Sequence, residues 1–300
     1  MAHCQAKDRL KGGKAVGEGR SAPTVSQLVL GLRLRDIRER AGRTFEDAAE
    51  ALSVNTTTVR RMEKAEVGLK PLYVEKLLRL YGRPEDEVES FVSEVRASHQ
   101  PGWWQRYRDV VPGWYALCVS LEQEAPLIRS YEPHHVPALL QTEEYARAQL
   151  AGHFPRADEE ELERRLEFRR RRQEILDRPT PPRLWVVVEE HALARPVGGP
   201  QVMRAQIDWL RQRHAHPRFT LQVLPFSVGP HPGLGGSFQL FRFDHHELPD
   251  VVYVDGMRRA HYLNERTDTT AYLEALDRMS TLAWPAEQTD AVLRRVRAEL

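Results

Sequence analysis

Apolar residues recur at helical spacing along the first third of the chain, between Gln27 and His99. Spacings of three and four residues bring such side chains to one face of a helix, so each run predicts an amphipathic helix. Gly42 ends the first run, and Pro71 begins the fourth. The pattern therefore predicts five short helices that close around one core. The expected inward-facing residues are Leu30, Leu34, Ile37, Ala41, Phe45, Ala48, Ala49, Leu52, Val59, Met62, Val74, Leu77, Leu78, Tyr81, Val88, Phe91, Val92 and Val95.

The pattern changes near Gln100. The segment "HQPGWWQRYRDVVPGWY" contains helix-breaking Pro and Gly residues and three of the six tryptophans. Beyond it, helical patterns alternate with short runs rich in Val, Leu and Phe, which are typical of strands. The sequence thus predicts an α+β fold, with a leader at 1–25, an all-α five-helix domain at 26–99 and a mixed α/β domain with a small sheet at 100–300. The second domain would contain helices at 113–124, 142–151, 158–177, 201–214, 267–283 and 286–299, and strands in "RLWVVVEE", "FTLQVLPF", "SFQLFRF" and "DVVYVDG".

Composition narrows the class of protein. The net charge is +1, so any attraction to nucleic acid must come from a local cluster of charges. Cys4 and Cys118 lie far apart and give neither a disulfide framework nor a metal pattern, which favours a reducing cytoplasm. No apolar run approaches the roughly 18 residues of a membrane span. The polar, Gly-rich and basic stretch before Val25 lacks the apolar centre of a signal peptide, and we interpret it as a disordered leader.

The segment "FEDAAEALSVNTTTVRRME" has the spacing of a helix-turn-helix. Thr44 and Asp47 form a capping-box pattern at the start of its first helix. Asn55 is a good N-cap for the second helix. Ala49 is a small residue where the two helices must approach closely. The inside of the elbow would be filled by Leu52, Val54 and Val59.

In a helix-turn-helix the second helix lies in the major groove of DNA, with its N-terminal residues at the base edges. Threonine hydroxyls at a helix start can bond phosphates, and threonine methyls can touch thymine methyls. Arg60 points outward one turn later and is the best candidate for a bidentate contact to guanine. The alternative is a plain helical bundle whose polar face is solvated. The predicted DNA-binding residues are Thr44, Asn55, Thr56, Thr57, Arg60, Arg61 and Lys64.

Residues 28–98 resemble the Cro and phage-repressor type of helix-turn-helix domain, which is XRE-like and lambda-repressor-like, through "AGRTFEDAAEALSVNTTTVRRMEKAE". The resemblance implies that the polar residues of the third helix face DNA. Two residues depart from that pattern. Phe45 stands where the family commonly has a Gln that contacts the DNA backbone. Ser53 replaces the usual turn Gly, at a cost of about 1 kcal/mol if the backbone there is left-handed.

The rest of the chain is similar to the C-terminal domain of actinobacterial antitoxin-like regulators. The matching segments include "QPGWWQRYRDV", "SYEPHHVPALLQTEEYARA", "PPRLWVVVEEHALARPVGGPQVMRAQIDWL" and "LQVLPFSVGPHPGLGGSFQLFRF". Genes of that family typically neighbour one for a small, toxin-like protein that is regarded as a regulatory partner. The resemblance therefore implies a transcriptional repressor or activator, as the antitoxin-like half of a pair, whose partners are operator DNA and a small protein.

Several alternatives stay open for the C-terminal domain. A small-molecule ligand bound there could gate the regulator in place of a protein. An enzyme is disfavoured because the sequence offers no convergent acid, base and nucleophile, so we expect neither catalysis nor a cofactor. We also expect a homodimer, because single helix-turn-helix units usually read half-sites as dimers.

Four other features allow either a purely structural or a functional interpretation. The pairs His134–His135 and His245–His246 invite a metal site, but adjacent histidines rarely face one ion. The glycine-rich run 231–238 is interpreted as a strand-connecting turn. Residues Arg169 to Arg172 are either a solvated, self-paired helix face or a second patch for DNA or an acidic partner. The aromatic cluster around Trp103 either joins the two domains or forms a ligand cage or a platform for single-stranded DNA.

Overall fold

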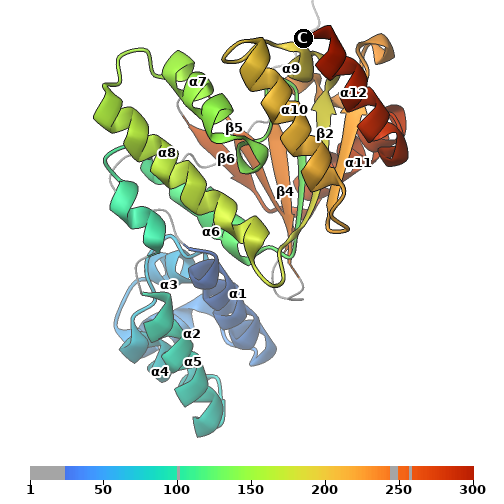
Figure 1. The fold of residues 1–300 in the computed structure, drawn as a ribbon. Helices are drawn as coiled ribbons and strands as arrows, with labels where there is room; N and C mark the ends of the chain where they lie inside the picture. Colours follow the sequence, from blue (N-terminus) through green and yellow to red (C-terminus); the bar gives the residue numbers. More distant parts are fainter. Residues whose placement is uncertain (1–23, 100–101, 244–248, 257–258) are drawn as a thin grey trace, which may run out of the picture.

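The computed structural model describes residues 24–99, 102–243, 249–256 and 259–300 (Figure 1). The predicted domain boundary near residue 100, residues 1–23 of the predicted leader and the pair His245–His246 lie outside these residues. The leader was predicted to reach residue 25, but α1 already begins at Val25, because Thr24 caps it. The five helices predicted for the N-terminal part are confirmed. They are α1 (Val25–Arg40), α2 (Phe45–Leu52), α3 (Thr56–Glu63), α4 (Pro71–Leu80) and α5 (Glu85–Ser98).

The predicted starts of α2 and α3 are also confirmed. Thr44 Oγ1 accepts a hydrogen bond from the backbone N–H of Asp47, whose carboxylate accepts one from the backbone N–H of Thr44. Asn55 Oδ1 accepts from the backbone N–H of Thr58 at 2.8 Å. Ser53, in the turn between the two helices, has φ 54°, so a residue with a Cβ atom adopts the left-handed conformation that favours glycine. These local contacts fix where α3 begins.

The apolar faces of α1 to α5 pack into one core, in which Leu34, Val59 and Val74 are fully buried. The predicted set of inward-facing residues is confirmed, with one exception. Ala41 is the exposed C-cap of α1, because the helix ends at Arg40 before another inward position is reached.

Residues beyond 102 build a six-stranded sheet in the order β3-β2-β1-β4-β5-β6, and the predicted α+β fold is confirmed. The strands β1 to β3 are parallel, whereas β4 to β6 are antiparallel neighbours. The strands are β1 (Leu127–Glu132), β2 (Arg183–Glu189), β3 (Phe219–Leu224), β4 (Phe238–Arg242), β5 (Val251–Asp255) and β6 (Ala260–Leu263). The α-helices are α6 (Ala116–Glu124), α7 (Glu143–His153), α8 (Glu159–Gln173), α9 (Glu190–Ala194), α10 (Pro200–His214), α11 (Arg266–Leu282) and α12 (Thr289–Glu299).

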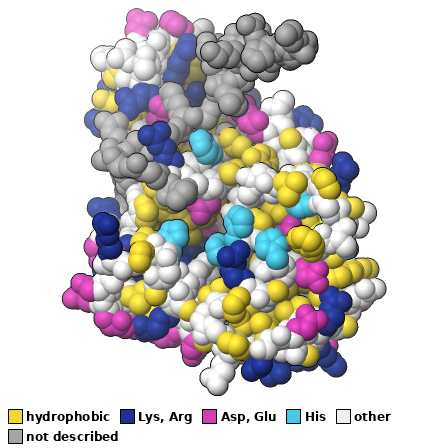
Figure 2. Space-filling view, turned by 90° about the horizontal axis from the view of Figure 1, so that it is seen from above, with side chains coloured by type: hydrophobic (Ala, Val, Ile, Leu, Met, Phe, Trp, Pro, Cys, Tyr) yellow, Lys and Arg dark blue, Asp and Glu magenta, His cyan; other side chains and the backbone are white. Residues whose placement is uncertain are grey.

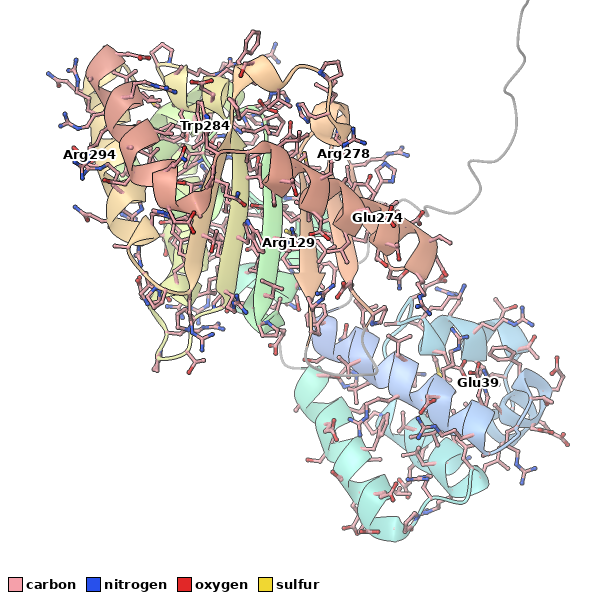
Figure 3. All side chains as sticks on the ribbon, turned by 90° about the vertical axis from the view of Figure 1, so that its right-hand side faces the viewer. Glu39, Arg129, Glu274, Arg278, Trp284 and Arg294 are labelled. Carbon is pink, nitrogen blue, oxygen red and sulfur yellow. The ribbon has the colours of Figure 1, made fainter. Side chains whose placement is uncertain are left out.

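Helices cover both faces of this sheet. Because successive residues of a strand point to opposite faces, Ile128 packs toward α6, α10 and α12, whereas Tyr131 packs toward α11. On the α11 face, Arg129 of β1 pairs with Asp277 of α11 at 2.7 Å. Figure 3 looks onto this face and shows α11 crossing the strands.

Four of the six strands were predicted, and β1 and β6 were not. The sequence of β1, "LIRSYE", has half of its residues polar and no regular alternation, but it is buried along most of its length. Arg129 pairs with Asp277 of α11 and lies over the Trp185 ring, whereas Ser130 Oγ is buried without a hydrogen-bond partner among the described residues. A strand whose buried side chains are polar lacks the Val- and Leu-rich composition that reveals the other strands.

The first turns of α1 contact the C-terminal part of the chain. Val25 is buried, and its backbone N–H donates to Ser120 Oγ of α6 at 2.8 Å. Leu28, Val29 and Leu32 pack against the same apolar cluster as α6. The helix α1 therefore belongs to the N-terminal core at one end and contacts the second core at the other. Within the described part of the chain, no helix has the length and apolar composition needed to cross a membrane.

Candidate nucleic-acid interface and C-terminal cavity

Helix α3 has one buried face and one exposed face. Val59 and Met62 point into the core of the N-terminal part, where their relative exposures are 0% and 2%. The predicted DNA-binding residues lie on the remaining faces of α3 and at the caps of α2 and α3. Thr44, Asn55, Thr57, Arg60 and Lys64 are exposed, while Thr56 and Arg61 are half-buried.

Some of these polar groups already have partners. Asn55 Oδ1 accepts from both the backbone N–H and the hydroxyl of Thr58, so only its amide nitrogen is left for another molecule. Thr44 Oγ1 accepts from the backbone N–H of Asp47, and hydrogen bonds from the Thr44 backbone and side chain lower the pKa of the Asp47 carboxyl. Arg61 lies 3.7 Å from a carboxylate oxygen of Glu66.

Two arginines lie over the ring of Phe45. The Arg60 guanidinium carbon lies 4.7 Å from the ring centroid, and that of Arg38 lies 4.0 Å from it. A cation over an aromatic face is attracted by the ring quadrupole, and the flat contact restricts the rotamers of the arginine. Phe45 therefore holds Arg60 at the surface of α3, a role that the sequence did not suggest.

A buried ion pair connects α3 to α1. Arg38 donates two hydrogen bonds to the Glu63 carboxylate, at 2.7 and 3.0 Å, and both residues are nearly fully buried. The hydrogen bond to Glu63 is the main cause of the raised pKa of Arg38. At Gly31, a Cβ atom would lie 2.7 Å from the backbone oxygen of Glu63, so only glycine lets the helices approach this closely. These contacts fix the orientation of α3 relative to α1.

The sequence analysis missed this pair, although a signal was present. Arg38 follows Leu30 and Leu34 at spacings of four residues, and Glu63 follows Val59 at the same spacing. Each charge therefore occupies an apolar position of its helix. Because a buried charge needs a partner, one basic and one acidic residue at such positions indicate an ion pair.

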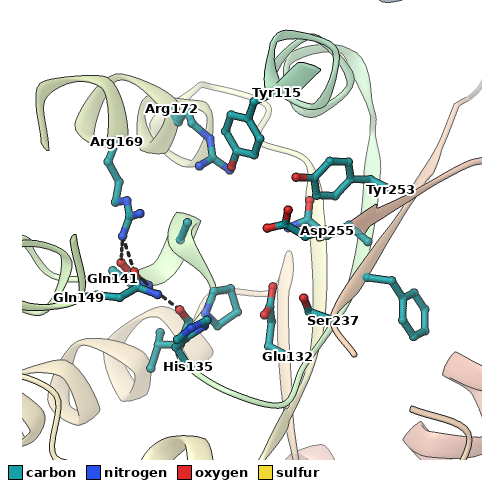
Figure 4. A pocket seen from close by; sticks show the side chains of 15 residues that line it. Tyr115, Glu132, His135, Gln141, Gln149, Arg169, Arg172, Ser237, Tyr253 and Asp255 are labelled. Atoms are coloured by element: carbon teal, nitrogen blue, oxygen red, sulfur yellow. Dashed lines mark hydrogen bonds between the residues drawn. The ribbon is translucent and has the colours of Figure 1, made fainter. Parts of the chain in front are cut away.

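A cavity of about 150 Å³ lies in the C-terminal part, at the carboxyl end of β1 (Figure 4). Glu132, Tyr253 and Asp255 line it from the sheet, and Arg169 and Arg172 line it from α8. The chain leaves β1 for β2 on one side, while β4 lies on the other side. Such switch points at the carboxyl ends of strands are common ligand sites in open sheets.

The sheet side of the cavity is acidic. Burial, with the nearby Asp255 carboxylate as the second cause, raises the pKa of Glu132 to about 8. Burial also raises the pKa of Asp255, which opens to solvent on one side. Neither carboxylate forms an ion pair with a basic side chain of the described residues. The two groups therefore retain a proton between them near neutral pH.

The helix side of the cavity is basic. Arg172 is neutralised, because its guanidinium pairs with Glu122 of α6 at 2.6 Å and both side chains are buried. Arg169 has no carboxylate partner among the described residues and instead donates to the side-chain oxygens of Gln141 and Gln149. Burial lowers its pKa to about 10, so Arg169 keeps its charge at neutral pH.

Two further groups at the cavity are polar and neutral. The Tyr253 hydroxyl is buried and makes no hydrogen bond of normal geometry, although it is close enough to Asp255 to lower the pKa of that carboxyl. Burial lowers the pKa of His135 to about 4, so its imidazole carries no charge at neutral pH. Sequence reasoning missed this site, because its residues come from segments more than a hundred positions apart.

The alternatives left open for Arg169 to Arg172 are decided by where each side chain lies. Arg170 and Arg171 pair at the surface with Glu143 and Glu174, whereas Arg169 and Arg172 face the cavity. The four residues therefore form neither a purely solvated face nor one surface patch. No group of three or more potential metal ligands is present among the described residues, His134–His135 included.

The aromatic cluster packs within the C-terminal part. Trp103 lies 5.6 Å from Phe168 of α8 between ring centroids, and Tyr107 lies 5.5 Å from the same ring. Trp104, Val110 and Val119 belong to this cluster. The two parts also contact each other between α1 and α6.

The loop at 225–237 presents apolar side chains. It follows β3 and includes Phe226 and Leu234, which are 79% and 70% exposed. The loop is anchored, because His231 Nε2 lies 3.0 Å from the Glu189 carboxylate at the end of β2. The backbone N–H of Phe226 also donates to Glu190. Figure 2 looks onto this end of the molecule and shows hydrophobic side chains and several histidines there.

Two family models match this chain. The model described as "Domain of unknown function (DUF5753)" matches residues 115–295, which include the sheet and the cavity. The model described as "Helix-turn-helix domain" matches residues 29–91, and it confirms the motif predicted around α2 and α3. No curated protein and no solved structure matches the chain.

Proposed function

This chain belongs to the DUF5753 family and carries a helix-turn-helix domain ahead of the family's domain, and on that premise we propose that it is a transcriptional regulator that binds operator DNA through α3. The carrying observation is the exposed polar face of a helix whose other face is buried. Thr57, Arg60 and Lys64 follow one another at spacings of three and four residues, so they project from the same side of α3.

The chemistry of this face fits the major groove. Arg60 can donate two hydrogen bonds to guanine, and its stacking on Phe45 lowers the entropy that it would lose on binding. The amide hydrogens of Asn55 can be donated to a phosphate, and the exposed Thr44 hydroxyl can do so by exchanging its hydrogen bond to Asp47. Thr56, Arg61 and Lys64 complete the proposed contact set.

Arg60→Ala tests the assignment. Full-length protein first selects its sites from a random DNA pool, and affinities are then measured for selected and unrelated DNA. Arg60→Ala should lose about 1–3 kcal/mol on selected sites and much less on unrelated DNA. Arg96→Ala, which removes an exposed arginine of α5, is the matched control and should change neither affinity. Equal losses of Arg60→Ala on both DNAs would refute the base contact, and failure of the wild type to select DNA would refute the function.

We propose that the regulator acts as a homodimer in the cytoplasm. Single helix-turn-helix units usually read half-sites, so a dimer gives a two-fold operator. Sedimentation of the full chain and a footprint on selected DNA test this. A monomer that protects only one half-site would contradict it.

We further propose that a small protein encoded nearby is the regulatory partner, as in the antitoxin-like family that the sequence resembles. The proposal is supported by Phe226 and Leu234, because exposed apolar side chains on an anchored loop are typical of protein contacts. The double variant Phe226→Asp/Leu234→Asp should abolish partner binding. Leu72→Asp is the matched control, since Leu72 of α4 is 60% exposed but lies in the DNA-binding part. We propose a binding role for this loop and domain, without catalysis or a cofactor.

A small-molecule effector is the second candidate, and the cavity favours it. Arg172 lines the cavity and pairs with Glu122 of α6, and Ser120 of the same helix accepts a hydrogen bond from Val25 at the start of α1. A shift of α6 upon ligand binding would therefore reach the helix that holds α3 through Arg38 and Glu63.

A further inference from the structure

We propose that the cavity at the carboxyl end of β1 binds one small zwitterion of the size of an α-amino acid, with its ammonium group at Glu132 and Asp255 and its anionic group at Arg169. The binding site stands on the cavity alone. A regulatory effect of the ligand rests on the proposed function, because ligand binding can change DNA affinity only if the protein binds DNA.

The first reason is the separation of charge. Figure 4 shows Arg169 on one side of the cavity and Glu132 and Asp255 on the other. Among the described residues no ion pair joins the two sides, and Arg169 donates its hydrogen bonds to the amide oxygens of Gln141 and Gln149. Charges removed from water are costly unless they are paired. A ligand that carries a cation at one end and an anion at the other neutralises both sides at once.

The second reason is a polar group that lacks a partner. The Tyr253 side chain is 3% exposed, lines the cavity and makes no hydrogen bond of normal geometry. A buried polar group without a partner destabilises the protein. An ammonium group bound beside Asp255 would supply the missing partner, because the Tyr253 oxygen can accept one of its N–H groups.

The third reason is size. An apolar cavity of about 150 Å³ holds a molecule as large as benzene, so this cavity accepts about six to ten non-hydrogen atoms. Nucleotides and peptides are too large. Arg172 adds no free charge, because Glu122 neutralises it. The net demand of the site is therefore one anionic group and one cationic group on a small molecule.

The direct test is calorimetric titration of the full chain with each proteinogenic α-amino acid in that size range. Propionate and propylammonium, each with one charge, serve as matched probes. At least one amino acid should bind, with an affinity at least about tenfold higher than either probe, which corresponds to one lost charge-assisted contact. Absence of binding by all amino acids, or equal binding by a single-charge probe, would overturn the proposal.

Variants then assign the two ends of the ligand. Arg169→Gln and Asp255→Asn should each weaken binding of the amino acid by about tenfold or more. Arg170→Gln is the control, because Arg170 lies on the same helix but pairs with Glu143 at the surface. Tryptophan fluorescence of each variant checks that it is folded. If Asp255→Asn and Arg169→Gln bind as tightly as the wild type, the proposal is overturned. DNA binding of the wild type is measured without amino acids. Failure of this measurement would contradict the proposed function, whereas failure of the titrations would contradict only the ligand site.

Discussion

Glu63→Ala should strongly destabilise the N-terminal helices. The substitution leaves the Arg38 guanidinium buried without the carboxylate that accepts its hydrogen bonds at 2.7 and 3.0 Å. Arginine cannot escape by losing its proton, and the remaining carboxylate, Glu39, is half-exposed at 3.5 Å. Breaking a buried pair in this way costs about 3–5 kcal/mol. A unit of the size of residues 24–99 has a total stability of about 4–11 kcal/mol, at about 0.05–0.15 kcal/mol per residue.

Urea unfolding of the full chain can resolve this loss. All six tryptophans lie at residue 103 or beyond, so tryptophan fluorescence reports only the C-terminal part. Far-ultraviolet circular dichroism reports the helices of both parts. With a slope of about 1–3 kcal/mol per molar urea, the loss should move the transition of the N-terminal helices down by at least about 1 M. The fluorescence transition should stay in place.

The double variant Arg38→Met/Glu63→Leu is the control for loss of charge pairing. It removes both charges and fills their volume, so its stability should return to within about 1 kcal/mol of the wild type. The reasoning is refuted if Glu63→Ala costs less than about 1 kcal/mol, or if the double variant is as unstable as the single one.

Three further outcomes are expected. Arg61→Ala should weaken binding to all DNA sequences alike and lower the salt slope by about one ion, as a phosphate contact does; a loss confined to one sequence would contradict this. Ser53→Gly should raise the free energy of unfolding by about 1 kcal/mol in urea titrations, because φ is 54° at this turn, and an unchanged midpoint would show that the turn is unstrained. Stability should fall by about 1–3 kcal/mol as pH rises from the ordinary pKa of Glu132, 4.5, to its folded pKa of about 8, because the folded state binds this proton more tightly. Burial and Asp255 of β5 favour the protonated form of Glu132, whereas Arg172 of α8 and Gln239 of β4 oppose it. Thermal unfolding at several pH values measures this pH dependence of stability, and Glu132→Gln should remove it.

The helices, caps and turn of the DNA-binding part were determined by the sequence alone. Thr44 with Asp47, Asn55 with Thr58 and the left-handed Ser53 all depend on residues at most three positions apart. Such local contacts do not depend on tertiary packing, so the spacing of residues along the sequence is enough to predict them. Four strands were predicted for a similar reason, since their apolar runs are buried on both faces.

The tertiary structure alone decided which charges meet. Arg38 and Glu63 lie on different helices, and Phe45 acquires its contact with Arg60 only because α2 and α3 cross. The cavity depends on strand order even more strongly. β1 looks too polar to be a buried strand, yet it brings Glu132 opposite Arg169 of α8. Asp255, from a strand more than a hundred residues later, completes the site because β4 pairs with β1 on one side and with β5 on the other. Local pattern carries no information about such pairings, because they are set by how whole elements pack.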